Sequence, residues 1–180
     1  MLVRIGKCRV QLVLGDITQQ QVDVIVNAAN PEMAGGSGVD GAIHQAGGPD
    51  IMQDTDARYP DGCPVGGAVE SVAGLLPTRH VIHTVGPIWR GGRDGEPAAL
   101  ASCYRKTLQL AVKLECKSVA FPAISTGVYG YPLDLAANVA LKSVIDFLKW
   151  HKQPEEVRFI LFGEGAFGAF ARSLELQTGS

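Results

Sequence analysis

The chain has 180 residues, 46% of them hydrophobic and 19% charged, which predicts one globular domain over residues 1–180 with a sizeable buried core. Its formal net charge is −2 and Lys and Arg form no run, so we expect no nucleic-acid partner, because a phosphate backbone is bound by clustered cations. No stretch reaches the ~20 apolar residues of a membrane span, and the four cysteines form no CxxC pair, so we expect a cytoplasmic protein with reduced thiols and no membrane association.

Strands and helices are expected to alternate along the chain. Strand runs are rich in apolar and β-branched residues, and helical runs repeat apolar residues on one face. This alternation predicts an α/β fold, a three-layer α/β/α sandwich with a mixed, largely parallel central sheet. The expected elements are strands 9–14 and 22–28, helix 41–47, strands 68–72 and 80–85, helix 97–115, strand 118–124, helix 132–150, strand 157–162, and a closing helix marked by Phe167, Phe170, Ala171 and Leu174.

Ligands of such folds bind beyond the carboxyl ends of the parallel strands, and the sequence is unusual at four of these ends. The first carries Asp16 and Ile17, within Gly-Asp-Ile-Thr. An Asp at this place can accept a hydrogen bond from an exocyclic amine such as that of adenine. Asp is also a common cap or turn residue, and this alternative stays open.

The second strand end carries two asparagines followed by a glycine-rich loop and a helix start. Asn27 and Asn30 offer donors and acceptors that suit the vicinal hydroxyls of a sugar. The backbone amides of the loop and the helix start can bind an anion such as phosphate. Asp40, a carboxylate beside that anion, is better suited to orient water or a sugar hydroxyl. The loop and helix start comprise Gly35, Gly36, Ser37, Gly38, Val39 and Asp40.

The third strand end carries a second glycine-containing loop, with amides for phosphate and aromatic rings to shape a pocket. The alternative is that its hydroxyl residues are ordinary caps. At the fourth end, Phe162 could stack on a base, although a core Phe is the commoner explanation for a single ring. The residues of the third end are Ser125, Thr126, Gly127, Val128 and Tyr129.

Other site types do not fit the sequence. Residues 36–41 match GxGxxG, but several residues separate them from the strand and no acidic residue ends a strand about 20 positions later. No P-loop pattern occurs, and Ser125 has no GxSxG context. The histidines have neither HExxH nor zinc-site spacing, so we expect no metal and no cofactor. His80 and His83 lie in an apolar strand and are expected to be structural.

The motifs together resemble the macrodomain family, and within it the MacroD-type O-acetyl-ADP-ribose deacetylases and mono-ADP-ribosyl hydrolases. They occur in the family's order over nearly the whole chain. Ser37 departs from the family's usual glycine, and Val65 and Gly67 depart from the usual Cys-Pro-Thr-Gly-acidic stretch. The matching segments are 15–18, 27–30, 35–44, 63–66, 79–89 and 124–132.

The resemblance implies a role for each residue. Asp16 and the Ile17 amide would bind adenine, Phe162 would stack on it, and Asn27 and Asn30 would face the distal ribose. The segments 35–39 and 125–129 would hold the diphosphate from two sides, with Tyr129 against the distal ribose. Asn30 and Asp40 would be the residues tied to hydrolysis.

The expected function is binding of ADP-ribose and hydrolysis of ester-type bonds to its distal ribose. Substrates would be O-acetyl-ADP-ribose or mono-ADP-ribosylated proteins modified on acidic side chains. The main alternative is a non-catalytic reader that only binds ADP-ribose, and Asp40 together with Asn30 favours the enzyme. Removal of the phosphate from ADP-ribose phosphate would use the same pocket.

Overall fold

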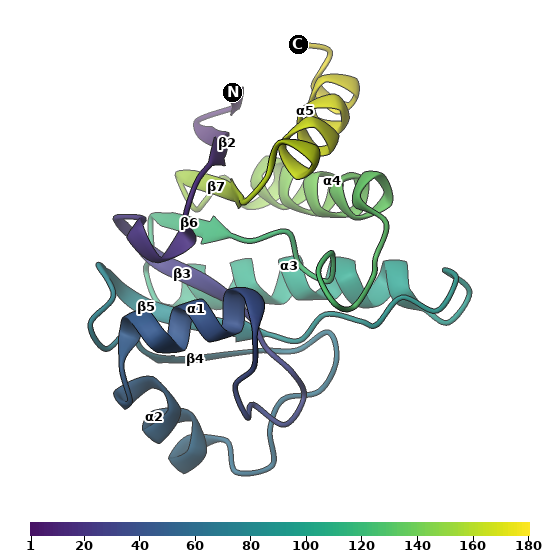
Figure 1. The fold of residues 1–180 in the computed structure, drawn as a ribbon. Helices are drawn as coiled ribbons and strands as arrows, with labels where there is room; N and C mark the ends of the chain where they lie inside the picture. The colour runs from purple at the N-terminus through teal and green to yellow at the C-terminus, as the bar shows by residue number, and fades with distance from the viewer.

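A computed structural model describes residues 1–180 (Figure 1). It contains seven strands, five α-helices and one 3-10 turn, η1 (Ile17–Gln19). The strands are β1 (Leu2–Ile5), β2 (Cys8–Leu14), β3 (Val22–Ala28), β4 (Ala68–Val72), β5 (Thr78–Thr84), β6 (Ser118–Phe121) and β7 (Glu156–Leu161). The helices are α1 (Gly38–Gly47), α2 (Asp50–Arg58), α3 (Glu96–Lys113), α4 (Leu133–His151) and α5 (Glu164–Thr178).

All seven strands form one sheet in the order β1-β2-β7-β6-β3-β5-β4. The five inner strands run parallel, while β1 pairs antiparallel with β2 and β4 pairs antiparallel with β5. The central strands β3 and β6 bury apolar residues on both faces, because helices cover the sheet on both sides. Because the five inner strands are parallel, their carboxyl ends meet at one edge of the sheet, where the segments that follow them lie close together.

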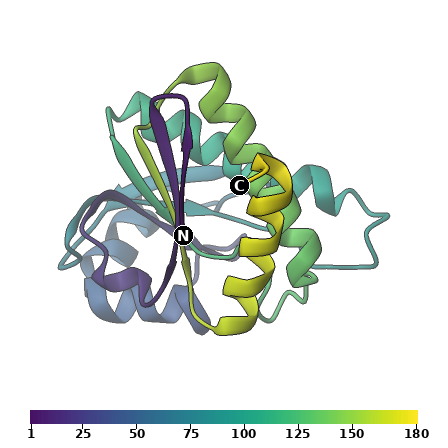
Figure 2. The ribbon, with the colours of Figure 1, turned by 90° about the horizontal axis from the view of Figure 1, so that it is seen from above.

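The sheet is the middle layer of three. Helices α1 and α2 contact its β3 and β4 strands on one face, and α3, α4 and α5 pack together on the other (Figure 2). The larger core, of 31 buried residues, lies between the sheet and α3–α5, and a smaller one of 10 lies under α1 and α2. Ile43 on α1 and Ile25 on β3 are buried in this smaller core. Burial of each such side chain contributes about 1.5–3 kcal/mol, which holds α1 against the sheet.

The fold predicted from the sequence is confirmed, with local differences. The helix predicted over residues 41–47 begins at Gly38, so Asp40 lies inside its first turn. The hairpin strand β1 and the helix α2 were not predicted. The strand expected over residues 118–124 ends at Phe121, and the next residue, Pro122, has no N–H to donate to a ladder. No helix combines the length and apolar character needed to cross a membrane. The four cysteines are free and buried.

Candidate active site

Two adjoining cavities open at the carboxyl edge of the sheet, with volumes of about 420 and 450 Å³. We call them the Asp40 cavity and the Phe162 cavity, after one residue in each wall. Five residues line both, Gly38, Val39, Pro122, Ala123 and Gly127, so the cavities meet between the N-terminus of α1 and the loop after β6 and form one crevice. An α-helix N-terminus presents free N–H groups and a partial positive charge, which makes the junction suitable for an anion.

The glycine-rich loop before α1 is held close to the helix. A Cβ on Gly41 would lie 2.6 Å from the Gly36 carbonyl oxygen, so only glycine permits this approach. Asn30 fixes the loop from the other side: its Nδ2 donates to the Gly35 carbonyl (2.8 Å) and its Oδ1 accepts from the Ala34 N–H (3.0 Å). The loop is therefore shaped before any ligand arrives.

The loop after β6 forms the opposite wall. Ser125 adopts a φ of 67°, which L-residues rarely occupy, and its carbonyl accepts from the Tyr131 N–H at 3.0 Å. Gly86, at the end of β5, makes this conformation possible, since a Cβ there would lie 2.2 Å from the Ser125 hydroxyl. The Tyr129 carbonyl accepts from the Trp89 N–H (2.9 Å), which ties the loop to the segment that precedes α3.

Asp40 lies in the first turn of α1 and lines the Asp40 cavity, with 6% of the residue exposed. Its Oδ1 accepts from Asn27 Nδ2 (2.8 Å) and lies 3.2 Å from His44 Nε2. Its Oδ2 has no hydrogen bond within the protein. Burial raises the pKa of Asp40, but the hydrogen bonds from His44 and Asn27 outweigh this effect, and the pKa lies below its ordinary value. The carboxylate is thus ionised at neutral pH with one oxygen unbonded.

The Phe162 cavity has an aromatic ring at its mouth. Phe162 follows β7 and is 92% exposed, so it is not a core residue. Asp16 and Ile17 line the same cavity, and Asp16 Oδ1 accepts from both the backbone N–H and the hydroxyl of Thr18. Asp16 therefore caps η1 through one oxygen, while the other makes no hydrogen bond within the protein.

Comparison with known proteins identifies the family. The family model for the Macro domain matches residues 26–140. The chain belongs to the macrodomain family. A curated relative from Cronobacter sakazakii, named O-acetyl-ADP-ribose deacetylase, is 51% identical over 92% of this chain and 93% of its own length. The protein of the same name from Escherichia coli K12 is 49% identical over 95% of this chain and 98% of its own.

Solved structures agree with this assignment. The Oceanobacillus iheyensis macrodomain with ADP superposes with a TM-score of 0.94, at 38% identity, over 99% of this chain and 96% of that chain. The Trypanosoma brucei macrodomain in complex with ADP-ribose gives a TM-score of 0.84, at 39% identity, over 92% of this chain and 68% of that one.

The macrodomain fold brings most of the predicted site residues to the crevice. The Asp40 cavity is lined by Asn30, Gly36, Ser37, Gly38, Val39, Asp40, Ser125, Gly127, Val128 and Tyr129. The Phe162 cavity is lined by Asp16, Ile17, Gly38, Val39, Thr126, Gly127 and Phe162. Ser37 has a φ of −102°, which any residue adopts, so the serine causes no backbone strain in this macrodomain.

Two predicted residues lie outside the cavity walls. Asn27 was expected to face the sugar, but it is fully buried and its amide contacts Asp40 and His83 instead. Gly35 bonds Asn30 through its carbonyl, and its φ of 78° explains the need for glycine. Both residues therefore support the site through a residue of its wall: Asn27 through Asp40, and Gly35 through Asn30.

Sequence reasoning missed two contributors to this macrodomain's site. His44 contacts Asp40, and the available signal was their spacing of four residues on one helix, which places them on the same face. Gly86 lines the Asp40 cavity and could not be singled out among 22 glycines. No group of three or more His, Cys, Asp or Glu side chains is arranged to hold a metal ion.

Proposed function

We propose that this macrodomain binds ADP-ribose and hydrolyses ester bonds on its distal ribose. The substrates are the acetyl ester of O-acetyl-ADP-ribose and the esters that join mono-ADP-ribose to acidic side chains of proteins. The observation that carries the proposal is the Asp40 carboxylate, which is ionised, has one unbonded oxygen and lies at the wall of a cavity beside an anion-binding helix end. The names of the relatives from Cronobacter sakazakii and Escherichia coli support it.

The shape of the crevice suggests how the ligand lies. ADP-ribose consists of two ribose-bearing halves joined by a diphosphate, and the crevice consists of two cavities joined at the N-terminus of α1. We assign the diphosphate to this junction, where backbone amides can bind it from two sides. We assign adenine to the Phe162 cavity, between the exposed ring and Asp16, and the distal ribose to the Asp40 cavity, near Asn30 and Tyr129.

In the proposed reaction a water molecule attacks the acyl carbon of the ester. Asp40 Oδ2 accepts a hydrogen bond from this water and takes its proton as the new C–O bond forms. The ribose oxygen leaves with a proton from Asp40, which releases ADP-ribose and the carboxylic acid. Because hydrogen bonds hold the pKa of Asp40 low, it is a weak base, and we expect positioning of the water to be its larger contribution.

Replacement of Asp40 tests the proposal. We expect Asp40→Ala to lower kcat on O-acetyl-ADP-ribose by about 10²–10⁴-fold, because it removes the positioning of the water together with a weak general base, while Kd for ADP-ribose measured by calorimetry changes little. The matched control is Asp134→Ala, since Asp134 also lies in the first turn of a helix but is exposed at the surface on α4. Full turnover by Asp40→Ala would contradict the mechanism.

Asn30→Ala should behave differently, because Asn30 shapes the glycine-rich loop before α1 through Gly35 and Ala34. We expect this variant to lose turnover and also to bind ADP-ribose more weakly. A separate assay on the wild-type protein distinguishes an enzyme from a reader. It measures the release of ADP-ribose from a mono-ADP-ribosylated protein. Tight binding without any release from either type of substrate would identify a reader.

A further inference from the structure

A continuous chain of buried polar groups leads from the Asp40 carboxylate through the sheet to β4. It runs from Asp40 on α1 to Asn27 on β3, then to His83 on β5 and Ser71 on β4. We propose that His83 is a positioning residue for hydrolysis, because it fixes the Asn27 amide in the orientation that donates to Asp40. This inference rests on the proposed function of Asp40.

Both hydrogens of the Asn27 amide nitrogen are used in hydrogen bonds, one to Asp40 and one to His83. Asn27 Nδ2 donates to Asp40 Oδ1 at 2.8 Å and lies 3.1 Å from His83 Nδ1. Because Asp40 is ionised and can only accept, the nitrogen of Asn27 must face it. The reversed amide would place an oxygen against the carboxylate. The acceptor nitrogen of His83 provides the second contact that holds the amide in place.

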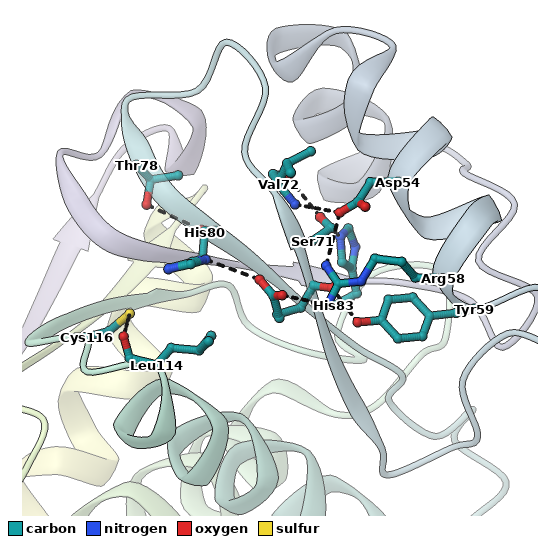
Figure 3. Close-up of polar contacts among 11 residues, drawn as sticks. Asp54, Arg58, Tyr59, Ser71, Val72, Thr78, His80, His83, Leu114 and Cys116 are labelled. Atoms are coloured by element: carbon teal, nitrogen blue, oxygen red, sulfur yellow. Dashed lines mark hydrogen bonds and ion pairs between the residues drawn. The ribbon is translucent and has the colours of Figure 1, made fainter.

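Ser71 sets the state of the His83 ring. With the Ser71 hydroxyl donating to the Val72 carbonyl (2.9 Å), its oxygen accepts from His83 Nε2, 2.8 Å away. The residues lie side by side in Figure 3. Asn27 Nδ2 can only donate to Nδ1, which requires the same tautomer. The proton therefore sits on Nε2, which leaves Nδ1 as an acceptor for Asn27. Burial is the main reason that the pKa of His83 falls to about 4, so the ring stays neutral at physiological pH.

A second histidine on β5 shows that this connection is specific. His80 contacts Glu70, which in turn contacts Arg58 at the end of α2; His80 and Arg58 are labelled in Figure 3. This second network has no hydrogen bond to a residue of the crevice. Of the two histidines on the strand, only His83 is linked to Asp40, through a single intervening side chain.

Two substitutions of His83 test its contact with Asn27 and its contact with Ser71 separately. In His83→Asn, the amide oxygen can take the place of Nδ1 and still accept from Asn27, but the contact with Ser71 is lost. In His83→Gln, the amide nitrogen can take the place of Nε2 and still donate to Ser71, but nothing accepts from Asn27. Gln fills more of the ring's volume than Asn does, so a merely space-filling role would favour His83→Gln.

We expect His83→Gln to lower kcat on O-acetyl-ADP-ribose about tenfold or more, since a buried donor beside Asp40 loses its partner. His83→Asn should retain kcat within about threefold, even if its melting temperature is lower. Kd for ADP-ribose should change little in both variants, because His83 does not line the crevice. His80→Asn is the matched control and should leave kcat unchanged. A nitrogen NMR spectrum of the wild type should show a proton on Nε2 and none on Nδ1 of His83.

The outcomes distinguish a failure of the proposed function from a failure of the positioning role of His83. If wild-type protein does not hydrolyse the ester, the proposed function fails, while the NMR spectrum still tests the ring state that the inference requires. If the wild type is active and His83→Gln matches or exceeds His83→Asn in kcat, the positioning role is wrong. A proton on Nδ1 of His83 in the wild type would overturn it as well.

Discussion

Replacement of Phe162 by Ala tests the assignment of adenine to its cavity. The ring is 92% exposed and lies at the mouth of the Phe162 cavity, so it contributes little to the core. Stacking of a base on an aromatic ring is worth about 1–3 kcal/mol by alanine substitution, which corresponds to a rise of about 5–150-fold in Kd. The free energy of unfolding should change by less than about 0.5 kcal/mol, as for other surface positions.

Calorimetry with two ligands distinguishes a lost contact to adenine from a general loss of binding. Phe162→Ala should weaken binding of ADP-ribose, whereas affinity for ribose 5-phosphate, which lacks adenine, should stay as in the wild type. Trp150→Ala is the control variant: Trp150 is also an aromatic residue, 83% exposed, but it lies on α4 in a groove beside α3. Its replacement should change neither affinity.

Two results would refute this reasoning. Unchanged affinity of Phe162→Ala for ADP-ribose would show that the ring does not contact adenine. An equal loss of affinity for ribose 5-phosphate would show that the variant disturbs the loop before α1 or the loop after β6 instead. Equal melting temperatures of variant and wild type by calorimetry would confirm that the effect is on binding.

Two further predictions concern the loops around the crevice. Gly41→Ala should weaken ADP-ribose binding roughly tenfold or more, ~1.4 kcal/mol in binding free energy, because the new Cβ would displace the Gly36 carbonyl. The control is Gly165→Ala on α5, where no atom lies near the new Cβ and the affinity measured by calorimetry should not change. Hydrogen bonds from three backbone N–H groups, including that of Arg90, outweigh burial and lower the pKa of Glu96 from 4.5 to about 2. The stability that ionised Glu96 contributes is present above pH ~4.5 and is lost as pH falls toward 2, so the melting temperatures of wild type and Glu96→Gln should converge over that range; a constant difference would contradict this.

Periodicity alone was enough to predict the elements with a strong apolar pattern, such as β3 and the long helices α3 and α4. Helix α2 escaped because it is polar and buries only Ile51 and Thr55, so it has almost no apolar stripe. Strand β1 escaped because it is a four-residue edge strand with one buried side chain, Ile5. In both cases tertiary contacts, and not local sequence, stabilise the element.

The crevice was predictable because parallel strands end at the same edge of a sheet, so four separate segments could be assigned to one site. The packing behind it was not. Asn27 is 13 residues from Asp40 and 56 from His83, and their contacts depend on the register that pairs Asn27 with His83 across β3 and β5. The prediction of His83 as a structural histidine is confirmed by its two buried hydrogen bonds, but its link to Asp40 required the structure.

Neither cavity has a lysine or arginine side chain in its walls. An anion held at the junction would be neutralised by fixed main-chain dipoles at contact distance, and mobile ions screen such short contacts far less than they screen separated surface charges. A protein built in this way can hold a small dianion across a wide range of ionic strength. Because these contacts are local, the crevice gains little from the long, uniform charge of a polyanion, and we expect an excess of RNA to compete only weakly with a small nucleotide.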